Sequence, residues 1–228
     1  MDDPEFAKFI EDAEAGASSE RRAAIGAKIK RLARSPQAFG EWYLELFAGL
    51  CYHVYSEYDL LRNAHKANQR GDVPLLAWRA RNLLELSVWS TYFALDQTSA
   101  RRIYEDAGRD ALEILTVFQK WGEATSQPAD WIDPLVRERA DILLRAEREG
   151  IQTLDGPYKG VATAARECGI YEHYSVGNKL LSKFAHPTAM QILGVSDEAK
   201  VKLQRDHFFG QGCSFFTGAI TALEDVAF

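Results

Sequence analysis

Cysteine pairs are missing from this chain of 228 residues. Its three cysteines, Cys51, Cys168 and Cys213, are far apart and odd in number, and no CxxC pair occurs. These spacings argue against a disulfide framework and against a cysteine-based zinc site. We therefore expect no disulfide-linked partner, and a reducing cytoplasm is the expected compartment.

The sequence also has no long apolar run and no excess of positive charge. No run approaches the roughly 18 apolar residues of a membrane-spanning helix, and the acidic N-terminus MDDPEFAKFIEDAEAG lacks the apolar stretch of a signal peptide. We therefore expect no membrane partner. The net charge of −6 argues against broad coating of DNA or RNA, which takes a basic surface. It leaves room for a local basic cleft.

Strand patterns are nearly absent, because no run alternates apolar and polar residues with a period of two. Helical periodicity is present almost throughout. It predicts an all-α fold, a helical bundle of about four long antiparallel helices plus shorter ones. We expect an N-terminal helical arm at 1–35 and a single bundle domain at 36–228. The expected helices span 4–15, 19–34, 37–69, 74–96, 98–124, 133–148, 159–168, 171–186 and 197–224.

Smaller signals refine this prediction. Ser18 or Ser19 is a suitable N-cap for the second helix. In the last helix Gly210, Ser214 and Gly218 are spaced by four, so small residues form one line along it. This line predicts close packing against a neighbouring helix.

The segment WRARNLLELSVWSTYFALD, 78–96, is apolar on two sides, which predicts the central helix of the bundle. Glu85 lies within its stripe of Trp78, Trp89 and Tyr92, and Arg81 lies one turn earlier. A carboxylate in an aromatic stripe is costly unless it is paired. Two interpretations remain open: Arg81 only neutralises Glu85, or Glu85 lines a polar pocket.

The segment YEHYSVGNKLLSKFAHPT, 171–188, carries an unusual row of polar residues. If it is helical, one face holds Tyr171, Ser175, Lys179, Ser182 and His186. Pro187 disfavours helical conformation at the residue before it, so we expect His186 to be the last residue of this helix or the cap of a following helix that has Pro187 in its first turn. His186 then either caps that helix or takes part in a site.

The two segments form one site if their helices face each other. The residues that would form it are His186, Arg81, Lys179 and Glu85. Ser182, Ser175, Tyr171 and Asn82 would bind the ligand. No cofactor or metal is expected in this site. A separate hypothesis is a metal-binding bundle with the ligands His53, Glu57, Glu85 and His186, although the paired Glu-x-x-His motifs of di-iron bundles are absent.

The chain resembles an uncharacterised family of bacterial all-helical proteins in three features that follow one another. These are an Arg-x-x-x-Glu helix, the segment RRIYEDAGRDALEIL, and a row of Tyr and Ser residues that ends in histidine. That family is distantly related to HEPN (higher eukaryote and prokaryote nucleotide-binding) domains. The resemblance covers roughly 40–190. It implies a helical bundle, often a homodimer, and in many HEPN proteins a metal-independent ribonuclease of toxin or phage-defence systems. For such a site the resemblance implies His186 as general acid and base, Arg81 and Lys179 as stabilisers of phosphate, and Glu85 as the group that orients His186.

The ribonuclease motif of HEPN domains, Arg-x(4–6)-His, is altered here. Lys179 and His186 form K-x6-H, and lysine offers phosphate a point charge in place of a bidentate fork. We therefore expect first a domain that binds a nucleotide, RNA or another small ligand, in a defence or stress context. A ribonuclease that uses His186 is the alternative, so the sequence leaves enzymatic activity open.

Overall fold

The structure is a computed structural model that describes residues 4–34, 40–67, 72–151, 154, 158–186 and 197–227. Within these ranges the chain forms nine α-helices and no strand, which confirms the all-α prediction. None of the described helices combines the length and apolar character that a membrane crossing needs. The helices are α1 (Pro4–Gly16), α2 (Ser19–Ala33), α4 (Glu41–Ala67), α5 (Val73–Leu95), α6 (Gln97–Ala124), α7 (Ala129–Arg148), α8 (Val161–Glu167), α9 (Tyr171–Ala185) and α11 (Glu198–Asp225).

The chain divides into two compact units, which are described separately. The first unit comprises Met1–Ala100 with Gly160–Phe228, and the second comprises Arg101–Lys159. This division differs from the predicted one, an arm at 1–35 and one domain at 36–228. The predicted helix at 98–124 was expected to be one of four long bundle helices, but α6 belongs to the second unit from Arg101 onward.

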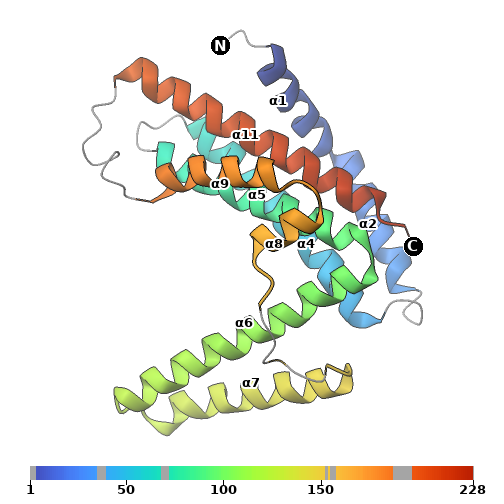
Figure 1. Cartoon of the computed structure of the whole chain (residues 1–228), viewed down its shortest axis with the longest axis vertical. Coiled ribbons are helices and arrows are strands. Elements are labelled where there is room, and N and C mark those ends of the chain that lie inside the picture. The colour runs from blue at the N-terminus through green and yellow to red at the C-terminus, as the bar shows by residue number, and fades with distance from the viewer. Residues whose placement is uncertain are drawn as a thin grey trace. The chain divides into compact units, whose positions relative to one another are not determined.

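Helix α5 is the central helix of the first unit, as its two apolar sides predict. It packs against α4, α8, α9 and α11, and Figure 1 shows it among them. The side chains of Leu76, Ala80 and Leu83 are fully buried. Trp78 departs from the predicted buried stripe, because it is 41% exposed and the Arg79 guanidinium lies 4.5 Å from its ring centroid.

Aromatic contacts fix the register of α4 against α5 and α11. Tyr43 lies 4.8 Å from Phe93 between ring centroids, near the start of α4 and the end of α5, so these two helices are antiparallel. Tyr58 stacks on Phe216 at 4.1 Å, whereas His65, later in α4, stacks on the earlier Phe209 at 4.0 Å. Helix α11 therefore also runs antiparallel to α4.

Gly212 lies where α11 packs closely against its neighbours. A Cβ atom there would lie 2.3 Å from Leu61 Cδ2 and 3.5 Å from the Cα of Ala80. Gly218, which the spacing of small residues placed in the contact, is exposed and has open space around its Cβ position. The prediction of close packing along that line is therefore wrong at Gly218.

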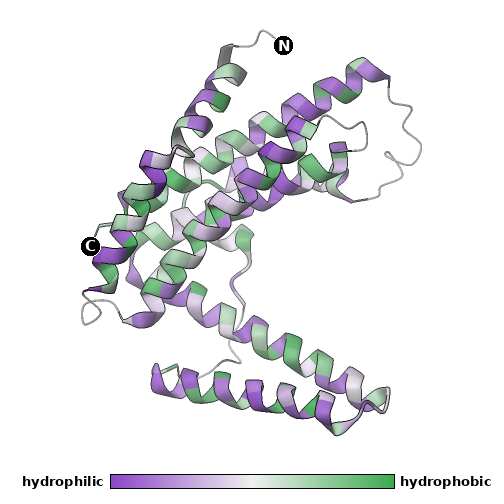
Figure 2. Ribbon diagram, turned by 180° about the vertical axis from the view of Figure 1, so that it is seen from behind, coloured by the Kyte–Doolittle hydropathy of each residue, from purple (hydrophilic) through white to green (hydrophobic). Residues whose placement is uncertain are grey.

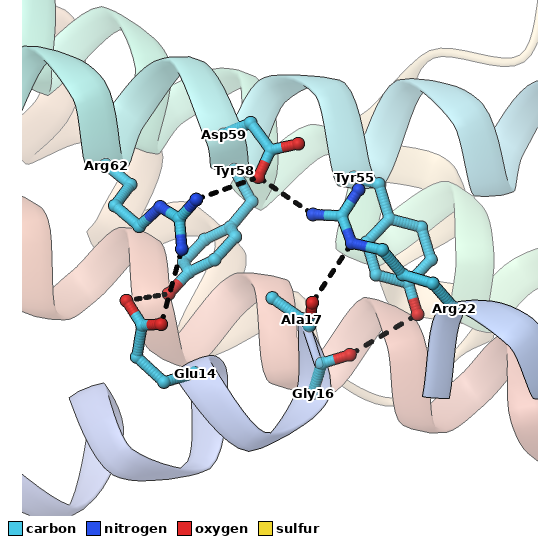
Figure 3. A network of polar contacts seen from close by, with 8 residues as sticks. All are labelled: Glu14, Gly16, Ala17, Arg22, Tyr55, Tyr58, Asp59 and Arg62. Atoms are coloured by element: carbon cyan, nitrogen blue, oxygen red, sulfur yellow. Dashed lines mark hydrogen bonds and ion pairs between the residues drawn. The ribbon is translucent and has the colours of Figure 1, made fainter. Parts of the chain in front are cut away.

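Helices α1 and α2, within the predicted N-terminal arm, are joined to α4 by a polar network (Figure 3). Arg22 donates to the Asp59 carboxylate at 2.8 Å and to the carbonyl of Ala17 at 3.0 Å. Tyr58 donates to Glu14 at 3.3 Å. Ser18, one of the two predicted candidates, is the N-cap of α2 and accepts from the Arg21 amide at 3.3 Å.

The second unit is built around a helical hairpin formed by α6 and α7. Trp121 and Trp131 meet with their ring centroids 5.5 Å apart, while Arg101 at the other end of α6 donates to the carbonyl of Glu149. The two helices are therefore antiparallel. The buried Asp106 accepts from the Lys159 amide at 3.0 Å, which ties the end of this unit to α6.

Candidate functional site

Helix α9 lies along α5 and ends at the predicted residue. Gly177 permits the close approach, because a Cβ there would lie 3.1 Å from Leu84 Cδ2. His186 is the C-cap, with an extended backbone at φ −113° and ψ 149°. The prediction that His186 ends its helix is confirmed. Pro187, on which the prediction rested, lies outside the described residues.

The guanidinium of Arg81 on α5 connects the two predicted segments. Its Nε donates to Asn178 Oδ1 at 3.1 Å, its Nη1 lies 3.2 Å from His186 Nε2, and its Nη2 lies 3.0 Å from Glu85 Oε1. Ser182 donates to the same Asn178 oxygen at 3.3 Å. We call Arg81, Glu85, Asn178, Ser182 and His186 the Arg81 cluster.

The contact between Arg81 and His186 is compatible with one tautomer of the imidazole. A guanidinium only donates hydrogen bonds, so His186 Nε2 must accept. The ring is then neutral and carries its proton on Nδ1. A doubly protonated ring would place two donors against each other and break this contact.

Glu85 is paired with Arg81 and is part-exposed, with about a third of its side chain accessible. The predicted cost of an acid among aromatic residues is therefore largely removed by solvent and by the ion pair. In the described part of the chain Glu85 makes no direct hydrogen bond to His186. Arg81 lies between them and contacts both side chains. The predicted orienting role of Glu85 could therefore act only through Arg81.

Tyr174, one turn before Asn178, is buried beside the Arg81 cluster. Burial is the main cause that raises the pKa of its hydroxyl, and the negative charge of Glu85 adds to it while Arg81 opposes it. The hydroxyl is therefore held neutral through the physiological range. It adds an uncharged polar group beside the ion pair.

Not every predicted ligand residue joins the cluster. Lys179 is exposed on α9, one residue beyond Asn178. Ser175 is half-buried and makes no side-chain hydrogen bond to another described residue. At the start of α9, Tyr171 lies 4.0 Å below the Arg166 guanidinium.

Asn82 is engaged elsewhere. Its amide donates to Glu57 Oε1 at 3.1 Å, and Arg79 donates to both oxygens of the same carboxylate at 3.1 Å. This interaction lies between α4 and α5, whereas the Arg81 cluster lies between α5 and α9. A role for Asn82 beside Arg81 does not follow from this geometry, because neighbouring helix positions point about 100° apart.

The predicted metal ligands are divided in the same way. Glu57 is held by Arg79 and Asn82 on one side of α5, and Glu85 is held by Arg81 on the other. The ring of His53 instead meets that of Tyr52 at 5.3 Å. Across the described ranges, no group of three or more His, Cys, Asp or Glu side chains could hold a metal ion.

Asn178 and Tyr174 are the residues of this site that the sequence interpretation missed. Both lie in the segment that suggested the site, and Asn178 precedes Ser182 by four residues. The signal was therefore present, since residues i and i+4 share a helix face. The predicted face excludes Asn178 because it is centred nearer to Lys179.

Comparison with known proteins adds no relative to this picture. The HEPN-like resemblance therefore remains a prediction that rests on short motifs. No family model matches the chain, and neither the curated proteins nor the solved structures contain a significant match.

Proposed function

We propose that the Arg81 cluster binds a ligand that carries a phosphate group, either a nucleotide or an RNA strand. The observation that carries this proposal is the part-exposed Arg81 guanidinium held by three partners from two helices. A guanidinium held in this way loses little conformational freedom when it binds an anion. It also keeps donors to spare, because only three of its five N–H groups have partners among the described residues.

The groups around Arg81 favour an anion over a neutral ligand. In the neutral tautomer described above, His186 offers Nδ1–H as a donor. Lys179 lies outside the cluster, and its exposed ammonium on the same helix adds positive charge to this part of the surface. These donors suit phosphate oxygens, which only accept hydrogen bonds when ionised. Glu85 opposes them, so a ligand would have to compete with its carboxylate for Arg81.

Binding is better supported than cleavage by the state of His186. A general base needs a free nitrogen lone pair, and Nε2 of His186 already accepts from Arg81. Attack of a ribose hydroxyl would first require this contact to open. RNA cleavage that uses His186 is therefore the second candidate, and the assay below detects it directly.

We expect Arg81→Gln to weaken nucleotide or RNA binding about 10- to 100-fold, the usual loss for one charged hydrogen-bond donor. Arg81→Lys keeps the charge without the planar fork, so it should fall between wild type and Arg81→Gln. The measurement is a titration with nucleoside mono-, di- and triphosphates and with a labelled single-stranded RNA, in EDTA.

Lys30→Gln is the matched control, because Lys30 is an exposed lysine on α2 and its replacement removes the same charge. It should bind as wild type does. Circular dichroism must show equal helicity for all variants. The proposal fails if wild type binds none of these probes at millimolar concentration, or if Arg81→Gln binds them equally. Cleavage of the RNA that disappears in His186→Ala would establish the second candidate instead.

A further inference from the structure

A pocket of about 710 Å³ lies in the first unit, between the last turn of α4 and the first turns of α11. This volume is in the range of pockets that hold small molecules, roughly 300 to 1,000 Å³. Figure 2 shows the first turns of α11 as mainly hydrophilic, whereas its later turns mix apolar and polar residues. We call this space the α4–α11 pocket. The charged and polar residues that line it are His65, Lys66, Glu198, Lys202, Arg205 and Asp206.

The inner wall of the α4–α11 pocket is held in place by contacts within the protein. The side chain of Arg205 is only 5% exposed, and it donates to Asp72 at 3.2 Å and to the carbonyl of His65 at 2.8 Å. The His65 ring stacks on Phe209 at 4.0 Å and lies 3.3 Å from Asp206 Oδ1. A ligand would therefore meet a wall that needs little rearrangement, which lowers the entropy cost of binding.

The charges of this inner wall are balanced near neutral pH. Arg205 is paired with Asp72, and Lys202 lies 3.8 Å from Asp206 Oδ2. Burial is the main cause that lowers the pKa of His65, while its contact with Asp206 opposes the shift. The imidazole is therefore neutral near pH 7 and adds no positive charge. A wall with balanced charges gives no general preference for an anion or for a cation.

Two further charges of the pocket have opposite signs and come from different helices. Lys66 lies in the last turn of α4 and Glu198 in the first turn of α11, and both are exposed. Neither side chain forms an ion pair or a hydrogen bond with another described residue, and the two do not pair with each other. A ligand that offers a carboxylate to Lys66 and an ammonium group to Glu198 would satisfy both charges.

We infer that the α4–α11 pocket binds a small molecule that carries both a carboxylate and an ammonium group, which is the chemistry of a free amino acid or a dipeptide. Lys66 binds the carboxylate and Glu198 binds the ammonium group. Ala199 and Val201, which also line the pocket, offer an apolar wall to the side chain of the ligand. The inference goes beyond the proposed phosphate site, because it uses no residue of the Arg81 cluster.

The test is a titration of the 15N-labelled full chain, followed by nuclear magnetic resonance, with each of the common amino acids and with the dipeptide alanyl-leucine. We expect a dissociation constant below about 1 mM for at least one of these probes. Two derivatives of the tightest probe then report on its ends separately. The N-acetyl form keeps only the carboxylate and the amide form keeps only the ammonium group. Each should bind at least about 10-fold more weakly, because one charged hydrogen bond is lost.

Two substitutions assign the ends of the ligand to their partners. Lys66→Met should weaken binding of the tightest probe about 10-fold and leave binding of its amide form unchanged, because that form has no carboxylate. Glu198→Gln should weaken the same probe about as much and leave the N-acetyl form unchanged. Lys200→Met is the matched control, since Lys200 is 69% exposed, lies in the first turns of α11 and pairs with Asp197. It should bind as wild type does.

The derivatives decide the question on the wild-type protein, and circular dichroism checks that the variants keep its helicity. The inference is overturned if no amino acid and no dipeptide binds at about 20 mM, or if either derivative binds as tightly as its parent. Folded variants at Lys66 and Glu198 that both bind like wild type would also overturn it. Arg81→Gln should leave this binding unchanged, and a loss there would place the probe in the Arg81 cluster instead.

Discussion

Replacing Phe216 with alanine is expected to lower the free energy of unfolding by about 4 kcal/mol. The Phe216 ring is fully buried, it stacks on Tyr58, and its centroid lies 5.6 Å from that of Tyr55. Gly16, at the end of α1, faces the same ring, because a Cβ there would lie 3.1 Å from Phe216 Cε1. The substitution therefore opens a cavity where α1, α4 and α11 meet.

Urea denaturation followed by circular dichroism measures this effect. Phe9→Ala is the control, since Phe9 lies on α1 and is partly exposed, and its replacement should cost less than about 1 kcal/mol. If α1 were only a loose arm, the cavity at Phe216 could relax towards solvent. A loss below about 2 kcal/mol for Phe216→Ala would therefore contradict the described packing of α1 on α11.

Replacing Arg205 with methionine is expected to cost about 3 kcal/mol of unfolding free energy. Arg205 on α11 is buried. It donates to Asp72 Oδ2 at 3.2 Å, at the start of α5, and to the carbonyl of His65 at 2.8 Å, near the end of α4. Methionine keeps most of the volume but provides no donor. The Asp72 carboxylate and the His65 carbonyl then both lose this partner away from bulk water.

Lys202→Met is the control for the charge itself. Lys202 lies three residues earlier on α11, is 75% exposed and pairs with Asp206 at 3.8 Å. Exposed ion pairs contribute little, so its replacement should change the unfolding free energy by less than about 0.5 kcal/mol. Equal effects of the two substitutions would show that Arg205 acts through net charge, and would contradict the role of its buried hydrogen bonds.

Local features of the fold could be predicted from the sequence because they depend on neighbouring residues. Helical periodicity and capping depend on residues within one or two turns. The N-cap of α2 was therefore narrowed to Ser18 or Ser19, of which Ser18 is the cap, and His186 was placed at the end of α9. The central place of α5 also followed, because its apolar residues occupy both sides of the helix.

Partner choice between helices could not be predicted in the same way. Periodicity shows that a face is apolar, but not which helix covers it. Helix α6 was expected in the main bundle, yet it pairs with α7 in the second unit. Likewise, Gly212 rather than Gly218 meets a neighbouring helix closely, because the rotation of α11 depends on the packing of Leu61 and Ala80.

The candidate site was half predicted for the same reason. Arg81, Glu85 and His186 were named together because each is chemically unusual in its segment. The direct contact turned out to be that of Arg81 with His186, and Asn178 completes it. Asn82 and Asn178 look equivalent in the sequence, and only the rotation of α5 and α9 decides which of them faces Arg81.

The most direct test of the proposed site is nuclear magnetic resonance of the His186 ring nitrogens in 15N-labelled protein at pH about 8, where an ordinary imidazole is neutral. Assignment uses His186→Gln. We predict a proton on Nδ1, and a shift of both ring nitrogens when adenosine triphosphate or a short RNA is added in EDTA. Adenosine, which lacks phosphate, should cause no shift, and in Arg81→Gln the response should need about 10- to 100-fold more ligand. The proposal would be contradicted by a proton on Nε2 of His186, or by ring nitrogens that shift with neither adenosine triphosphate nor RNA.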